Sequence, residues 1–255
     1  MSKLNDLRFK DLITLALDDS EREAYNYGNQ GDQPCVNGFC TSCEDSYGKQ
    51  NPVLNHILFG STTQDYIEFL KQDNIDTSNW DETPVMFVFE NPGECGKDDF
   101  KPSVSEGTTK QIISTWPYIG WESKGKFTKQ DFALKDNMKM KMYGELICAA
   151  ILHYELKNAY VTNLVKCGVE GGSNLSVYTK KVIDNCVENI FKQEFNAINP
   201  KVIFAFSKKV EKKLRQAFPD FKNIIYLPHP AARIATEKRE ELLKEGFSKG
   251  LNECS

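Results

Sequence analysis

The sequence predicts a three-layer α/β/α sandwich around a central sheet of four parallel strands. Four short runs of continuously apolar residues alternate with segments of helical periodicity, and strands that are apolar throughout are typical of parallel sheets covered on both faces. With 255 residues, the chain can bury one sizeable core. We therefore expect a single domain over residues 1–255, with a helical extension at 1–34 and an insertion or lid at 95–140.

The N-terminal part contains two helical patterns separated by irregular chain. Residues 2–27 are amphipathic and charged, and they predict a helix that ends near Gly28. Residues 28–51 are rich in Gly, Asn, Asp and Cys, which predicts irregular chain that something other than a hydrophobic core must hold in shape. A Thr cap signal and helical periodicity then predict a helix at 62–72.

The rest of the chain alternates strands with helices. Apolar runs predict strands at 84–90, 159–165, 200–206 and 223–230. Helical periodicity predicts helices at about 140–156, 178–197 and 210–218. Functional sites in parallel sheets gather at the carboxyl ends of the strands, so the polar residues found there are the first candidates for function.

Composition and charge exclude several classes of protein. Hydrophobic residues make up 40% of the chain and charged residues 27%, as in an ordinary folded domain. No stretch approaches the roughly 18 apolar residues of a membrane span and no signal peptide is evident, so we expect a cytoplasmic protein without a membrane partner. The net charge of -4 gives no global signal for nucleic acid. Lysine clusters leave room for local basic faces at 124–141, 180–181 and 208–215.

Polar side chains from three distant segments lie at the ends of the predicted strands. Glu90 and Asn91 end the first strand, Asn163 lies near the end of the second, and His229 ends the fourth. Glu90 or Asn91 could hold or polarise a water, and His229 could donate a hydrogen bond to a developing oxyanion. The Asn163 amide offers a donor and an acceptor, which match the edge of a pyrimidine. Alternatively, Asn91 belongs to an ordinary turn, Asn163 caps a loop and His229 merely ends a strand.

Four short motifs resemble those of a known family. They are FENPGE at 89–94, YVTNLVKC at 160–167, PKVIFAFS at 200–207 and LPHPAAR at 227–233. In this order they resemble the uracil-DNA glycosylase superfamily, and most closely its iron-sulfur branch, family four. The resemblance implies a monofunctional DNA glycosylase that hydrolyses the N-glycosidic bond of uracil or another modified or damaged base flipped out of DNA, leaving an abasic site.

The resemblance also assigns expected roles to individual residues. It makes Glu90, Asn91 and His229 catalytic, with Asn163 reading the pyrimidine and Pro92-Gly93 letting the backbone approach the substrate. An aromatic side chain should stack on the base; Phe100 is nearest to the expected place, and Trp116 or Tyr118 could substitute. The residues expected to contact DNA, single- or double-stranded, are Lys166, Arg233 and Ile234. We expect the protein to act as a monomer.

The cysteines offer a second comparison with the family. Of eight cysteines, Cys40-x2-Cys43 followed by Cys167 and Cys186 match the order of the family's ligands for a four-iron four-sulfur (4Fe-4S) cluster. Cys35 could replace Cys40 as a ligand. A structural zinc site is the main alternative, because four thiolates suit either metal. Either metal would be structural, since four protein thiolates leave no open position.

Departures from the family pattern surround the base pocket. Phe89 stands where the family has Gly, Ala231 replaces Ser, and GVEGGSN at 168–174 replaces an Arg-Pro-Pro segment. A Phe at the approach to the pocket would change its size or shape. Two other functions therefore stay open: a glycosylase for a bulky hypermodified base, serving phage defence, and a non-catalytic iron-sulfur protein that binds nucleic acid.

Overall fold

The computed structural model describes the core of the domain. The described residues are 52–57, 61–63, 75–91, 147, 150–165, 167–169, 175–229 and 232–252. The predicted N-terminal extension at 1–34, most of the predicted helix at 62–72 and the predicted insertion at 95–140 lie outside them.

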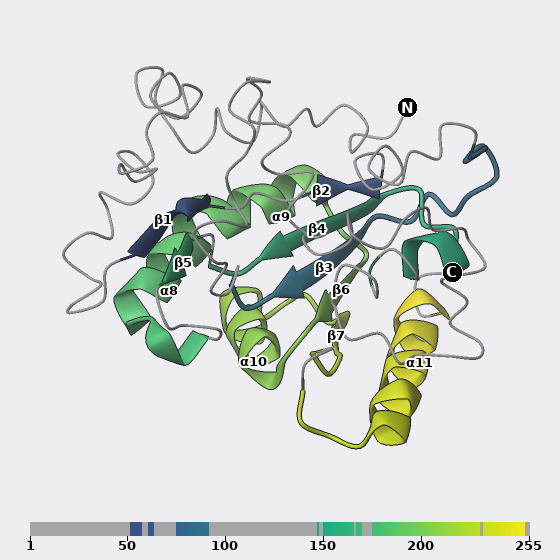
Figure 1. Cartoon of the computed structure of the whole chain (residues 1–255). Coiled ribbons are helices and arrows are strands. Elements are labelled where there is room, and N and C mark those ends of the chain that lie inside the picture. The colour runs from purple at the N-terminus through teal and green to yellow at the C-terminus, as the bar shows by residue number, and fades with distance from the viewer. Residues whose placement is uncertain are drawn as a thin grey trace.

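A mixed sheet forms the centre of the described structure (Figure 1). Its strands, in spatial order, are β2 (Ser61–Thr62), β4 (Ala159–Asn163), β3 (Val85–Phe89), β6 (Val202–Ala205) and β7 (Ile224–Tyr226). The last four are parallel to one another, and β2 pairs antiparallel with β4. The predicted four-stranded parallel sheet is thus confirmed, with a short antiparallel strand added at one edge.

The central strand β3 shows why its sequence is apolar throughout. All five of its residues are buried. Met86 and Val88 contribute to one hydrophobic cluster, whereas Val85, Phe87 and Phe89 contribute to another on the opposite face. Because side chains alternate across a strand, a sheet covered on both faces needs apolar residues at every position.

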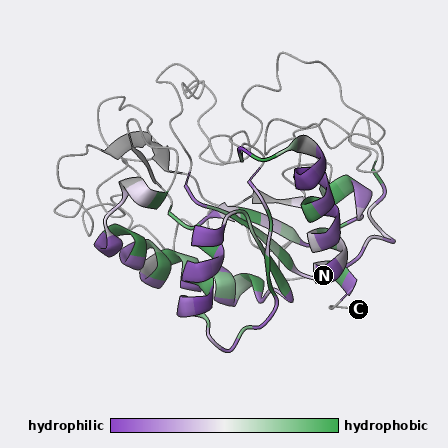
Figure 2. Cartoon of the chain, turned by 90° about the horizontal axis from the view of Figure 1, so that it is seen from below, coloured by the Kyte–Doolittle hydropathy of each residue, from purple (hydrophilic) through white to green (hydrophobic). Residues whose placement is uncertain are grey.

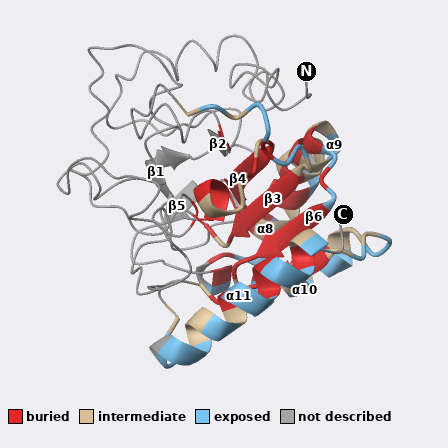
Figure 3. Ribbon diagram, turned by 90° about the vertical axis from the view of Figure 1, so that its right-hand side faces the viewer, coloured by how far each residue is buried: buried red, intermediate tan, exposed pale blue. Residues whose placement is uncertain are grey.

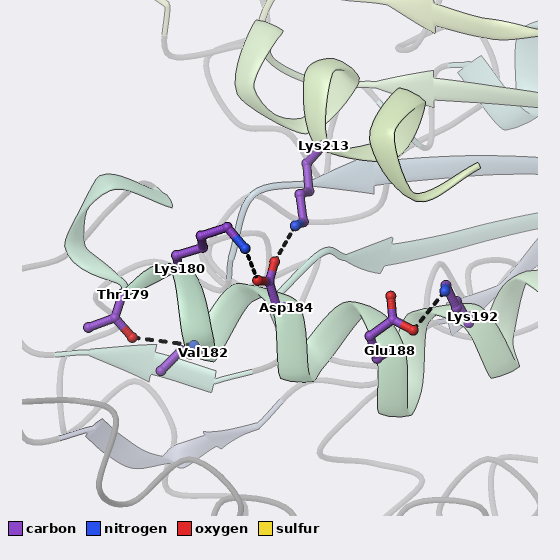
Figure 4. Close-up of polar contacts among 7 residues, drawn as sticks. All are labelled: Thr179, Lys180, Val182, Asp184, Glu188, Lys192 and Lys213. Atoms are coloured by element: carbon purple, nitrogen blue, oxygen red, sulfur yellow. Dashed lines mark hydrogen bonds and ion pairs between the residues drawn. The ribbon is translucent and has the colours of Figure 1, made fainter. Parts of the chain in front are cut away.

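Helices cover one face of the sheet in a nearly continuous run. α8 (Lys180–Cys186), a π-helical turn (Val187–Phe191) and α9 (Lys192–Ile198) follow one another, and α10 (Lys208–Ala217) packs beside them. Asp184 of α8 accepts hydrogen bonds from Lys180 and from Lys213 of α10 (Figure 4). The hydrogen bond from Lys180, and then that from Lys213, lowers the pKa of the Asp184 carboxyl, so this link between the two helices weakens only in acid.

The opposite face is covered by α11 (Thr236–Asn252) and by the helical residues 147 and 150–153. Figure 3 shows the strands buried between these layers, with exposed residues along the outer sides of α10 and α11. Figure 2 shows the same division in hydropathy, with hydrophobic residues gathered in the strands. The three-layer α/β/α arrangement is therefore confirmed. Within the described part of the chain, no helix is long and apolar enough to cross a membrane.

A second pair of strands lies outside the main sheet. β1 (Pro52–Ile57) pairs antiparallel with β5 (Cys167–Val169), with Ile57 opposite Cys167. Between β5 and α8, residues Leu175–Val177 form a 3-10 turn. Neither strand of this pair is among the predicted elements. The pair matters for the site because it brings the chain that follows Cys43 beside Cys167.

Some predicted boundaries are wrong, and each has a local cause. The helix predicted to reach 156 ends at His153, because Glu155 adopts a left-handed conformation (φ 52°) and Leu156 N donates back to Ile151 O at 3.0 Å. The helix predicted at 178–197 is interrupted by the π-helical turn after Cys186. All four predicted parallel strands are shorter than expected at one or both ends.

Helix α11 has no counterpart among the predicted elements. Its sequence carries Gly246 and Gly250, which lower helix propensity. A Cβ at Gly246 would lie 2.3 Å from Leu227 Cδ2, and one at Gly250 would lie 2.6 Å from Phe204 Cε1. The glycines therefore allow α11 to pack closely against β6 and the chain after β7, and tertiary contact outweighs propensity here.

Candidate active site

The predicted site residues from β3 and β4 lie at one edge of the sheet. Phe89, the last residue of β3, is in register with Asn163, the last residue of β4. The backbone pairing continues beyond both strands, since Leu164 N donates to Phe89 O at 2.8 Å and Val165 N donates to Glu90 O at 3.0 Å. Glu90, Asn91 and Asn163 therefore sit side by side at the carboxyl ends of neighbouring strands.

The Glu90 carboxylate is held by a backbone N–H of the 3-10 turn Leu175–Val177. Glu90 is half-buried, and its Oε2 accepts a hydrogen bond from Leu175 N at 2.5 Å. A charge-assisted bond to a backbone N–H is short and strong. It fixes one carboxylate oxygen of Glu90.

The Asn91 side chain is buried, with only 7% of the residue exposed. Its Nδ2 donates to the hydroxyl of Tyr178 at 2.9 Å. Its Oδ1 has no hydrogen-bond partner among the described residues. Buried polar atoms are nearly always paired, so an acceptor in this state indicates a place where a ligand or water donates a hydrogen bond. Nothing in the sequence around Tyr178 links it to Asn91, which precedes it by 87 positions.

His229 follows β7 and joins the same edge. Its ring packs edge-on against Phe89, with centroids 5.8 Å apart and planes at 88°. Burial lowers the pKa of His229, and the charge of Glu90 partly opposes this by raising it. The net lowering favours a neutral imidazole at pH 7. The Glu90 effect also shows that the carboxylate and the imidazole are close enough to interact electrostatically.

Phe89 packs into the hydrophobic core beside the site. Only 2% of the residue is exposed, and its ring stacks on Phe206 with centroids 4.3 Å apart and planes at 6°. Phe89 thus belongs to the core cluster behind His229. Its described contact with the site is through the His229 ring.

Asn163 is completely buried at the end of β4. The preceding Thr162 points to the other face, where its hydroxyl donates to Glu194 of α9 at 3.1 Å. The Tyr160 hydroxyl donates to the same carboxylate at 3.0 Å. Glu194 is itself only 1% exposed. Its carboxylate links α9 to β4. The sequence does not indicate this contact, because Glu194 lies in an ordinary helical pattern.

The predicted DNA-contacting residues Arg233 and Ile234 lie on the loop that continues from His229. Ala232 N donates to His229 O at 2.8 Å, and Ile234 N donates to Ala232 O at 2.9 Å. Arg233 is exposed, and Ile234 is 40% exposed, which is unusual for a large apolar side chain beside a site. The other predicted contacts, Lys166, Pro92, Gly93 and Phe100, lie outside the described residues, as do Trp116 and Tyr118.

Two of the four predicted metal ligands lie within the described chain. Cys186 is the last residue of α8 and is 3% exposed. Cys167 begins β5 opposite Ile57, the last residue of β1. Cys40, Cys43 and the alternative Cys35 lie outside the described residues, and the described residues alone contain no group of three or more metal-binding side chains. The predicted set of four thiolates therefore stays a prediction.

Comparison with known families agrees with this arrangement. A family model described as the uracil DNA glycosylase superfamily matches residues 79–249, which run from just before β3 into α11. The chain belongs to the uracil DNA glycosylase superfamily. Membership indicates a DNA glycosylase, a hydrolase that acts on DNA. The match begins after Cys40 and Cys43 and does not separate the iron-sulfur branch from the others. A search of the curated proteins found no match.

Proposed function

We propose that this member of the superfamily is a monofunctional DNA glycosylase that removes uracil or another modified base flipped out of DNA. One observation carries the proposal: Glu90, Asn91 and His229 share one edge of the sheet, and Asn91 presents a buried oxygen that has no partner among the described residues. Such an acceptor needs a donor from a substrate or a water.

In the proposed reaction, the bond between C1′ of the sugar and the ring nitrogen of the base breaks, and its electron pair leaves with the base. The sugar becomes oxocarbenium-like, as in glycoside hydrolysis generally. A water held by Asn91 Oδ1 adds to C1′ and gives its proton to Glu90. The neutral His229 donates a hydrogen bond to the oxyanion of the departing base, which its lowered pKa favours.

Recognition of the base and the DNA is assigned to neighbouring residues. The Asn163 amide reads the edge of the base from the end of β4. Arg233 and exposed Ile234 occupy the space that the flipped base leaves in the duplex, since they lie four and five positions after His229 on the same loop. Lys208 and Lys209, both exposed at the start of α10 after β6, supply positive charge near the same edge.

We further propose that Cys40, Cys43, Cys167 and Cys186 hold a structural 4Fe-4S cluster, with zinc as the alternative metal. Support comes from buried Cys186 and from the pairing of β1 with β5. When bound, the metal would tie irregular chain near the N-terminus to the sheet domain.

The test of the proposed function is a base-excision assay. Anaerobically purified protein is incubated with single- and double-stranded oligonucleotides carrying uracil, mismatched thymine, hypoxanthine or hypermodified cytosine, and alkali then reveals abasic sites. We expect excision of at least one base, without strand cleavage before alkali treatment. Activity on the hypermodified base alone would indicate the phage-defence alternative. Tight DNA binding without excision of any base would overturn the proposal.

Substitutions in the same assay separate the site from the fold. We expect His229→Ala to abolish excision without unfolding the protein, because His229 lies on a loop after β7. Asn91→Ala should behave similarly. Asn223→Ala is a matched control, since it removes an amide that binds Lys201 O at the opposite, amino-terminal end of the strands. Its activity should be unchanged.

A further inference from the structure

The orientation of the His229 ring is not set by regular secondary structure. Among the residues that the structure describes, the last backbone bond from this segment to the sheet runs from Leu227 N to Ala205 O, at 2.9 Å. Beyond it the chain leaves β7 and turns, with Ala232 N donating to His229 O. The edge-on contact with the Phe89 ring is therefore a side-chain means of orienting the imidazole.

Phe89 is well suited to this task because it is itself held firmly. Its ring is stacked nearly parallel on the ring of Phe206. Phe206 is also bound to the residue before Phe89, since Phe206 N donates to Val88 O at 2.9 Å. Phe206 in turn packs against Phe87, with centroids 6.3 Å apart. Offset and edge-to-face aromatic contacts favour particular ring angles, unlike aliphatic packing.

Phe89 also connects the two halves of the proposed chemistry. It directly precedes Glu90 and Asn91, and its ring touches His229. We propose that Phe89 is a positioning residue that, with Phe206 stacked behind it, holds the His229 imidazole in the orientation needed for catalysis. This inference rests on the proposed function for its catalytic part, whereas its structural part can be tested without turnover.

Phe87 provides a matched control for the experiment. It lies on the same strand and the same face as Phe89, is also buried, and stacks on Phe204 with centroids 5.4 Å apart. Its ring contacts are with Phe204, Phe206 and Phe247. Phe87→Leu therefore removes a similar aromatic ring from the same cluster, one whose ring partners include Phe206 but not His229, and it reports what the loss of core packing alone does.

The test compares Phe89→Leu with Phe87→Leu by nuclear magnetic resonance of the histidine rings and by steady-state excision kinetics. The chain has three histidines, and His229→Gln identifies the relevant signal. We expect both leucine variants to lose stability, but only Phe89→Leu to shift the His229 resonances and to raise the pKa of His229 toward the ordinary value, as water reaches the ring. We expect kcat to fall roughly 10- to 100-fold in Phe89→Leu, with KM little changed.

A second variant guards against loss of folding. Phe89→Met fills most of the volume without an aromatic ring, and it should show the same shift of the His229 signal. Equal effects of the Phe89 and Phe87 substitutions on the His229 signal and on kcat would overturn the inference, as would unchanged signals in Phe89→Leu. If the unaltered protein excises no base while Phe89→Leu still moves the signal, the proposed function fails and the control of the ring by Phe89 stands.

Discussion

His229 combines burial with a neighbouring carboxylate, and the balance between them decides its charge. Burial disfavours the protonated ring, whereas Glu90 favours it, and the net effect is a lowered pKa. A neutral imidazole can still donate one hydrogen bond. It therefore suits a reaction in which the leaving base becomes an anion, because donation does not require an earlier protonation of the site.

The lowered pKa of His229 predicts a pH dependence of stability. The unfolded chain binds a proton at His229 as the pH falls through about 6.5, whereas the folded protein resists protonation until the pH reaches the lower folded value. Folding therefore loses stability across that interval, by at most about 1.4 kcal/mol per pH unit for one proton. Urea unfolding of His229→Gln should show a weaker loss between pH 6.5 and 5 than the unaltered protein. Similar slopes in the two proteins would contradict the assignment.

At the level of residues, the sequence predicts that the candidate site residues lie together, but not which residues support them. Glu90, Asn91, Asn163 and His229 could be predicted to meet because each ends an apolar strand, and parallel strands end at one edge. Tyr178 and Glu194 could not be predicted, since their contacts join segments 87 and 34 positions apart with no shared periodicity. The inward packing of Phe89 likewise depends on Phe206 from another strand.

Among the elements, the short 3-10 turn Leu175–Val177 and the following Tyr178 contribute most to the order of the proposed site. Leu175 N binds Glu90, and the Tyr178 hydroxyl binds Asn91. The turn is anchored in its own right, because Lys209 of α10 donates to Ser176 Oγ at 2.9 Å and Thr179 caps α8. One small element thus holds both polar groups at the end of β3.

Removing the Tyr178 hydroxyl should show how far the position of Asn91 depends on its hydrogen bond to that group. In Tyr178→Phe, the buried amide nitrogen of Asn91 loses its acceptor, which costs about 1 to 3 kcal/mol of unfolding free energy, and we expect excision activity to fall with it. The ring and its packing are retained, so the effect reports the hydroxyl. In an Asn91→Ala background the same substitution should cost much less, because the bond no longer exists. Equal costs in the two backgrounds, measured by urea unfolding, would show that the hydrogen bond is not responsible.

Elements with strong hydrophobic patterns were predictable, and elements shaped by tertiary contact were not. The strands β3, β4, β6 and β7 follow from their apolar runs. In contrast, α11 depends on glycines that lie against Leu227 and Phe204, and the pairing of β1 with β5 joins residues as far apart in the sequence as Ile57 and Cys167. The π-helical turn after Cys186 also has no sequence signal of the kind that marks helix ends.

On the scale of the whole molecule, the family match and the proposed metal site cover different parts of the chain. The match spans 79–249, whereas Cys40 and Cys43 precede it and β1 lies between. β1 pairs with β5 at Cys167, and Cys186 shares a hydrophobic cluster with Leu164 and Val165 from the end of β4. A metal bound by these cysteines would therefore join the N-terminal part of the chain to the strand that carries Asn163.

This arrangement predicts that metal binding and folding are coupled. Cys167→Ala should lose bound metal and melt at a lower temperature, whereas Cys254→Ser, in the C-terminal tail, should change neither. We expect anaerobically purified protein to be brown with broad visible absorbance and to contain iron and sulfide, all of which Cys167→Ala should lack. Colourless protein with stoichiometric zinc would show that the same thiolates bind zinc and not an iron-sulfur cluster. Protein that binds neither metal, with Cys167→Ala as stable as the unaltered chain, would reject the site, because a structural metal contributes directly to folding stability.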